Sequence, residues 1–118
     1  MEAAPDSLLS PLGRITISSE AVAQLVGHTA AECYGVVGTV GRRRVGKLLG
    51  RDRLTRGIAV RRSTEGLQIE VHVVVEYGLN LAEVAATVRS RVAYEVERLT
   101  GLDVAAVEVH IEDVRRSA

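Results

Sequence analysis

Aromatic residues are scarce in this sequence. Phenylalanine and tryptophan are absent, and tyrosine occurs three times in 118 residues. Alanine, valine and leucine must therefore fill the core, and few flat rings remain on which nucleic-acid bases could stack. Cysteine occurs once, so no internal disulfide can form and nothing indicates an oxidising compartment.

Long hydrophobic runs are also missing. A membrane-spanning helix needs roughly 20 apolar residues. The stretch VHVVVEYGL is far shorter, and it is interrupted by His72 and Glu76. Residues 1–13 lack both the basic start and the apolar centre of a signal peptide. We therefore expect a cytoplasmic protein whose contact with the inner membrane face, if it makes one, is peripheral.

The chain is long enough, and with 47% hydrophobic residues apolar enough, to fold as one domain. Residues 1–13 contain both prolines and show no helical period, which predicts a flexible N-terminal arm. Residues 14–116 then form a single α+β domain, which opens with a short strand at Arg14–Ser18.

Strict alternation predicts a long strand over residues 67–77. Its odd positions should face the core, and they are Leu67, Ile69, Val71, Val73, Val75 and Tyr77. The even positions are mostly polar, so the opposite face of the sheet should lie in water or against a partner. Shorter strands are expected at residues 35–40 and 57–62, and a last strand at residues 104–114.

Two helices are predicted from apolar stripes. The first follows an N-cap at Ser18 or Ser19, and its stripe is Val22, Leu25, Val26, Ala30 and Cys33. The second begins after a capping box of Asn80 and Glu83 and ends at Gly101, which suits a left-handed C-cap. Its stripe is Leu81, Val84, Ala85, Val88, Val92, Val96 and Leu99.

The predicted order is β-α-β-β-β-α-β, and its last three elements form a crossover with parallel strands. This order predicts a two-layer sandwich in which a mixed β-sheet carries two long helices on one face.

The stretch ECYGVVGTVGRRR combines the cysteine with three glycines and three arginines. Cys33 lies on an apolar stripe near a helix C-terminus, where the helix dipole disfavours a thiolate, so we interpret it as a structural residue. The glycines follow a helix and lie in a strand, unlike those of a phosphate-binding loop, and we interpret them as sites of close packing. No catalytic residue is identified, and no enzymatic activity is predicted.

His72 and His110 are expected on the polar face of neighbouring parallel strands, close to Glu70, Glu76, Glu108 and Glu112. Two imidazoles and a carboxylate bind zinc where they converge. Solvent-facing residues that alternate along two strands produce the same pattern. Because the pattern leaves their convergence open, no metal and no cofactor is assigned.

The net charge is zero, but the charges are unevenly distributed. Residues 42–62 contain nine arginines or lysines against one acid, and residues 63–113 contain three arginines against ten acids. Arg42, Arg43, Arg44 and Lys47 are therefore predicted to form an anionic-contact surface for lipid headgroups or an acidic partner. The alternative is that the basic segment pairs with the acidic half of the same chain.

From Arg14 to Val114 the sequence resembles the bacterial alkaline shock protein (Gls) family of envelope stress response proteins. The matching pieces include YGVVG, GIAV, VHVVVEYGLNLAEVA and RVAYEVERLTGLDVAAVEVHIEDV. The resemblance implies a non-enzymatic cytoplasmic protein that is held near the membrane by a membrane-anchored partner and serves cell-envelope homeostasis. It implies no catalytic residue, cofactor or small-molecule substrate.

Edge strands with little protection predict, in addition, self-association into a homo-oligomer. The alternative function is that of a KH-like RNA-binding protein that uses the basic segment 42–62, although binding to nucleic acid is not the favoured interpretation.

Overall fold

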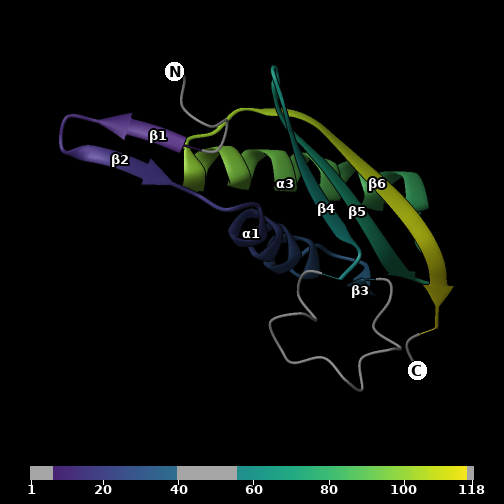
Figure 1. Cartoon of the computed structure of the whole chain (residues 1–118). Helices are drawn as coiled ribbons and strands as arrows, with labels where there is room; N and C mark the ends of the chain where they lie inside the picture. The colour runs from purple at the N-terminus through teal and green to yellow at the C-terminus, as the bar shows by residue number, and fades with distance from the viewer. Residues whose placement is uncertain (1–6, 40–55, 117–118) are drawn as a thin grey trace.

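The computed structural model describes residues 7–39 and 56–116. Its elements, labelled in Figure 1, are β1 (Ser7–Ser10), β2 (Gly13–Thr16), α1 (Ser19–Ala31), β3 (Val36–Thr39), β4 (Ile58–Ser63), β5 (Gly66–Glu76), α3 (Leu81–Thr100) and β6 (Val104–Arg115). The two helices pack on one face of a mixed four-stranded sheet. The predicted two-layer α+β sandwich is therefore confirmed.

Strand β5 organises the sheet. It pairs in parallel with β6 along one edge, from Leu67 to Glu76. Its other edge is shared by two antiparallel strands: β4 pairs with residues 66–71, and β3 pairs with residues 73–75. The predicted parallel crossover through α3 is thus present, and β5 is the strand that every other strand of this sheet contacts.

The core lies between the sheet and the helices and consists mostly of valine. The odd positions of β5 from Leu67 to Val75 are buried, as the alternation predicts. Helix α3 contributes a row at i, i+4 spacing, and α1 contributes a second row that includes Cys33 just beyond its end. Eight fully buried valines fill the space that larger aromatic residues occupy in other proteins; they are Val22, Val26, Val71, Val73, Val75, Val88, Val92 and Val96.

The helix caps follow the sequence signals. Ser18 accepts a hydrogen bond from the backbone N–H of Ala21, and Asn80 accepts one from that of Glu83. Gly101 ends α3 in the left-handed conformation with φ of 78°. The two side chains accept hydrogen bonds from backbone N–H groups at the helix starts, and Gly101 adopts the left-handed conformation common at helix ends.

The predicted N-terminal arm contains regular structure in residues 7–13. Strand β1 pairs with β2 in a two-stranded antiparallel hairpin, joined by the turn at Pro11 and Leu12, and Figure 1 shows it extending away from the main body. The hairpin adds one strand to the predicted order and forms a sheet of its own. Proline suits the second position of such a turn, so here it connects two strands. Residues 1–6 lie outside the described residues.

Three predicted core residues are instead exposed. Tyr77 follows the last residue of β5, is 58% exposed, and places its ring under the guanidinium of Arg116. Leu81 and Leu99 are 38% and 53% exposed, because α3 buries only a narrow i, i+4 row and these two residues lie beside its ends.

Candidate functional site

The tripeptide Glu-Val-His occurs twice, once in β5 and once in β6. The parallel register sets Glu70 opposite Glu108 and His72 opposite His110. The valines between them face the helices, so the four polar side chains share the outer face of the sheet. The two identical tripeptides therefore place two carboxylates and two imidazoles in a square. We call these four residues and Glu112 the Glu-His cluster.

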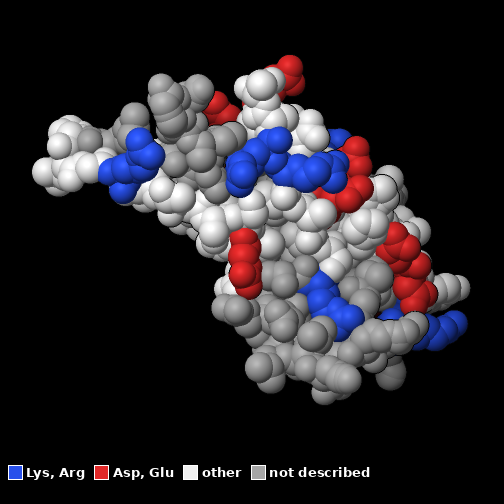
Figure 2. Space-filling model, viewed as in Figure 1, with Lys and Arg blue, Asp and Glu red and all other residues white. Residues whose placement is uncertain are grey.

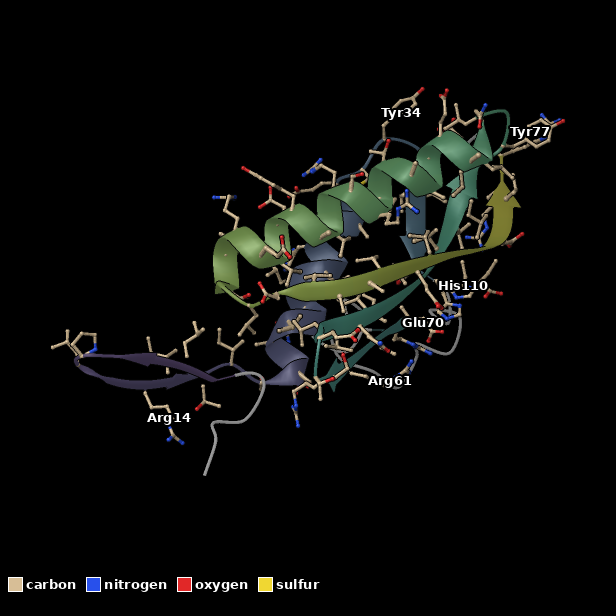
Figure 3. The ribbon with its side chains drawn as sticks, turned by 90° about the horizontal axis from the view of Figure 1, so that it is seen from above. Arg14, Tyr34, Arg61, Glu70, Tyr77 and His110 are labelled. Carbon is tan, nitrogen blue, oxygen red and sulfur yellow. The ribbon has the colours of Figure 1, made fainter. Side chains whose placement is uncertain are left out.

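The two imidazoles converge. The rings of His72 and His110 are stacked, with centroids 4.5 Å apart and planes 10° from parallel. Figure 3 shows Glu70 and His110 side by side on the sheet face that is turned away from α3. The question that the sequence left open, whether His72 and His110 meet, is thereby answered.

Three carboxylates surround the stacked rings. Glu112 Oε2 lies 2.7 Å from His72 Nδ1. Glu70 reaches both rings, at 4.0 Å from His72 Nε2 and 3.6 Å from His110 Nε2, and Glu108 Oε1 lies 3.4 Å from His110 Nε2. Glu70, His72 and His110 offer ligand atoms that all lie within 4.8 Å of one another. Glu76, in contrast, is paired with Arg115 in the register and is not part of this group.

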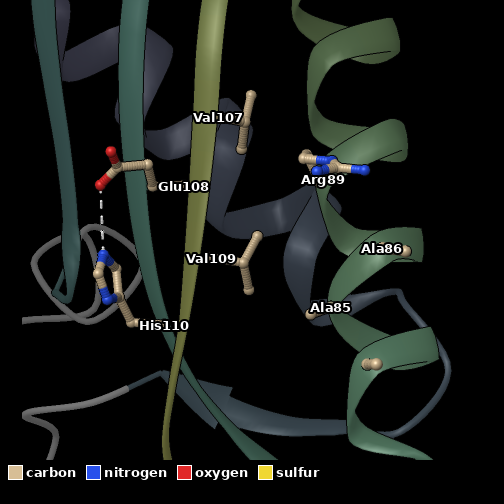
Figure 4. A pocket seen from close by; sticks show the side chains of 8 residues that line it. Ala85, Ala86, Arg89, Val107, Glu108, Val109 and His110 are labelled. Carbon is tan, nitrogen blue, oxygen red and sulfur yellow. Dashed lines mark ion pairs between the residues drawn. The ribbon is translucent and has the colours of Figure 1, made fainter.

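A second feature is a groove between β6 and α3 (Figure 4). It has a volume of about 700 Å³, and its helix side is formed by three alanines and Arg89, while Val107 and Val109 form its strand side. Within the described residues β6 pairs with β5 alone, so its other edge has no strand partner there. Glu108 and His110 of the Glu-His cluster contribute to the rim of the groove.

The outer surface is divided by charge. Figure 2 shows basic side chains over β4 and acidic side chains along β6. Arg61 of β4 lies in a small hollow of about 90 Å³ together with Glu70 and Glu108. The predicted anionic-contact residues Arg42, Arg43, Arg44 and Lys47 lie outside the described residues, so their surface stays a prediction.

The cysteine is a core residue, as predicted. Cys33 is 4% exposed, and its thiol donates a hydrogen bond to the carbonyl oxygen of Thr29 at 3.4 Å. Burial raises the pKa of the Cys33 thiol, with a smaller opposing effect from Arg91 and a smaller raising effect from Glu32. A thiol held in this way is a poor nucleophile at neutral pH.

Close packing at Gly35 is confirmed as well. The residue has φ of +92°, and an added Cβ would lie 2.7 Å from Leu79 Cδ1 and 3.1 Å from Val84 Cγ2. Close packing at Gly38 stays a prediction, and Gly41 lies outside the described residues.

These features define a small two-layer α+β domain with a polar outer sheet face and, among the described residues, one edge of β6 without a strand partner. The chain belongs to the alkaline shock protein 23 family, which has a cell envelope-related function, and the match covers residues 8–116. The resemblance to the alkaline shock (Gls) family is thereby confirmed. No helix among the described residues is long and apolar enough to cross a membrane.

Relatives of this chain differ in size. An "Uncharacterized protein YloU" of Bacillus subtilis is 33% identical over 112 residues, which cover 92% of this chain and 93% of that protein. A "Stress response regulator gls24 homolog" of Streptococcus pyogenes serotype M3 is 24% identical over 106 residues, covering 87% of this chain and 59% of that protein. The family places this chain among envelope- and stress-related proteins.

The fold is shared beyond the family. A solved MamM CTD structure superposes with a TM-score of 0.58 over 81% of this chain and 99% of that one. The two sequences are 15% identical. At this identity the likeness shows a common fold alone.

The sequence identifies every residue of the Glu-His cluster but not the contacts between them. The repeat of Glu-Val-His was the available signal, because two identical tripeptides on adjacent parallel strands form a square when they are in register. The groove beside β6 left no such signal, since it depends on which alanines of α3 face the strand.

Proposed function

We propose that this protein is a non-enzymatic interaction module of the cell envelope stress response, acting at the inner face of the membrane. It binds a second copy of itself and a membrane-anchored partner protein. Membership of a family with a cell envelope-related function supports this proposal. The buried Cys33 thiol, whose pKa is raised, supports a role without covalent catalysis.

The observation that carries the proposal is the edge of β6. Bulges interrupt its pairing with β5 near both ends, between Leu67 and Gln68 and between Val73 and Val74 of the partner strand. The stretch between the bulges, residues 106–111, is regular and contains neither proline nor lysine, two devices that block edge pairing.

A second copy of the chain suits this edge. An antiparallel copy of β6 centred on Val109 would place Glu108 beside the partner's His110 and Val107 beside the partner's Ile111. Apolar pairs placed in this way stabilise adjacent strands, and a carboxylate beside an imidazole accepts a hydrogen bond from its ring N–H. The three alanines of the groove leave room for side chains of the incoming strand, because alanine presents a small surface, and Arg89 lies beside them on the same helix.

Sedimentation equilibrium tests the self-association. Ala86→Glu adds a bulky charge to the helix side of the groove, whereas Ala21→Glu makes the same change at an exposed position of α1. We expect wild type and Ala21→Glu to associate at tens of micromolar and Ala86→Glu to remain monomeric. A monomeric wild type, or equal association of both variants, would remove β6 as the interface.

The membrane part of the proposal rests on the basic segment. Each lysine or arginine near an anionic membrane surface contributes about 1 kcal/mol, so Arg42, Arg43, Arg44 and Lys47 together give a salt-sensitive peripheral contact. Co-sedimentation with anionic vesicles at low salt tests it. We expect wild type to bind and the variant with all four residues changed to serine to stay in the supernatant; equal behaviour of the two contradicts the contact.

A further inference from the structure

We propose that Glu70, His72 and His110 bind a divalent transition-metal cation of the zinc type on the outer face of the sheet. This inference goes beyond the proposed function, because neither self-association nor membrane contact requires a metal. It rests on the register of β5 and β6, on the distances between the ligand atoms, and on the hydrogen-bond partners of the two rings.

The ligand atoms are close to the spacing that a metal requires. Zinc binds imidazole nitrogen and carboxylate oxygen at about 2.0–2.2 Å in a tetrahedral arrangement, which sets neighbouring ligand atoms roughly 3.3–3.6 Å apart. Glu70 Oε2 and His110 Nε2 lie 3.6 Å apart, and Glu70 Oε1 and His72 Nε2 lie 4.0 Å apart. Because the rings are stacked, their in-plane lone pairs run nearly parallel, and binding of one ion requires the rings to rotate until both Nε2 atoms point at it. The three side chains are only partly buried, which leaves room for this rotation.

Glu112 prepares His72 for this role. A hydrogen bond of 2.7 Å between His72 Nδ1 and a carboxylate oxygen requires the proton on Nδ1, since an ionised carboxylate only accepts. In the neutral imidazole with this tautomer, the lone pair is on Nε2, the atom that faces Glu70. Carboxylates hold metal-binding imidazoles in this way in many sites, where they fix both the tautomer and the ring orientation. Glu112 is therefore a positioning residue, not a ligand.

The Nε2 atom of His110 lies near the same carboxylate of Glu70. This atom is buried and makes no hydrogen bond to any residue that the structure describes, although carboxylate oxygens of Glu70 and Glu108 lie 3.6 and 3.4 Å away. A buried polar atom without a partner costs free energy, and coordination to a cation removes that cost. The imidazole of His110 thus has a geometric reason to coordinate.

The charges of the cluster favour a cation. Glu70 and Glu108 stand directly opposite each other in the ladder, an arrangement in which like charges are destabilising. Glu112 adds a third carboxylate beside the two rings. A divalent cation at Glu70 offsets this repulsion. Arg61 lies in the hollow beside Glu70 and Glu108 and offsets part of it already, so the affinity reflects a competition between the two.

The ligand types select the metal. Two imidazole nitrogens and one carboxylate suit zinc, cobalt or nickel, whereas calcium and magnesium prefer oxygen ligands throughout. The cysteine contributes nothing, because Cys33 is buried in the core on the helix side. Three protein ligands leave a fourth position for water, as in other open zinc sites.

Competition with a chromophoric zinc chelator measures the affinity of the full chain after removal of metal with EDTA. The histidines offer a matched set of variants: His72→Asn and His110→Asn alter ligands, and His28→Asn alters an exposed histidine of α1. We expect one zinc per chain in wild type and His28→Asn. Each ligand variant should lose more than about 100-fold in affinity, exceeding the 10–100-fold loss usual for an outer partner.

Cobalt gives an independent readout. A four-coordinate site gives Co²⁺ visible absorption bands that the hexahydrated ion lacks, and these should appear with wild type and disappear with Glu70→Gln, while magnesium should not compete. Circular dichroism confirms that each variant is folded. Wild type that binds no zinc at micromolar concentration, or a loss as large in His28→Asn as in His72→Asn, would overturn the proposal.

Discussion

The two faces of β5 and β6 are built on opposite principles. On the inner face, Val71 and Val73 are fully buried among residues of both helices. On the outer face, one residue away along the same strand, His72 stacks on His110 among carboxylates. The inner face is held by non-directional burial of apolar surface, and the outer face by directed contacts between ionisable groups. We expect stability to depend on the first and ligand binding on the second.

The strongest test of this comparison replaces each of two adjacent residues of β5, Val71 and His72, with asparagine. Val71→Asn loses a fully buried side chain and buries an unpartnered amide, so the free energy of unfolding should fall by about 3 kcal/mol or more. His72→Asn alters a side chain that is 30% exposed and should cost less than about 1 kcal/mol. Urea denaturation of both variants measures the difference, and equal losses would contradict the separation of the two faces.

A smaller change in stability tests how tightly side chains pack around Gly35 beside helix α3. Gly35 and Gly78 have similar positive φ angles, +92° and +101°, so alanine is strained at both by about 1 kcal/mol. Only at Gly35 would the new Cβ also meet Leu79 and Val84, whereas at Gly78 nothing lies within 4 Å. We expect Gly35→Ala to cost about 1 kcal/mol more than Gly78→Ala in thermal or urea unfolding. Equal losses of stability in the two variants would mean that Leu79 and Val84 move aside for the new Cβ.

Cys33 belongs to the hydrophobic core at the end of α1, and its replacement should lower stability only modestly. Cys33→Ala removes a buried sulfur and should cost about 1 kcal/mol at neutral pH. Burial raises the pKa of the folded thiol above that of the unfolded chain, so wild type loses this contribution as the pH rises through the folded pKa. The difference between wild type and variant should therefore shrink from about pH 7 to about pH 10.

The inner face was predictable because it is a property of single elements. Alternation in residues 67–75 and the i, i+4 spacing in residues 84–96 identify buried positions without knowledge of the partner strand. The exceptions, Tyr77, Leu81 and Leu99, lie at element ends, where the pattern continues after the chain has left the core. The sequence predicts the second strand of the β1–β2 hairpin but not its pairing with residues 7–10, because proline occurs both where regular structure ends and in turns between strands.

The outer face was predictable only in composition. Its histidines and glutamates could be named, but their meeting depends on the register between strands that are 38 residues apart in sequence, and that register includes two bulges. A shift of one residue would have turned every side chain of β6 to the other face. Local periodicity contains no information of this kind, so the Glu-His cluster required the structure.

The smallest expected effect concerns the charge next to the Glu-His cluster. Arg61 and Arg62 are neighbours on β4, but Arg61 lies beside Glu70 and Glu108, whereas Arg62 reaches Ser19 at the start of α1. If a cation binds at Glu70, Arg61 competes with it for the same carboxylate. Exposed charge pairs contribute about 0.2–1 kcal/mol, so Arg61→Gln should raise the zinc affinity by a factor of about 1.4 to 5.

Arg62→Gln is the matched control, because it removes the same charge from the opposite side of the strand and should leave the zinc affinity unchanged. The same chelator competition, at low and at high salt, measures both variants. The gain in Arg61→Gln should decrease with added salt, because screening weakens interactions between exposed charges. Equal gains in both variants would assign the effect to net charge, and the outer face would then behave as a diffuse acidic surface with no directed contact between Arg61 and Glu70.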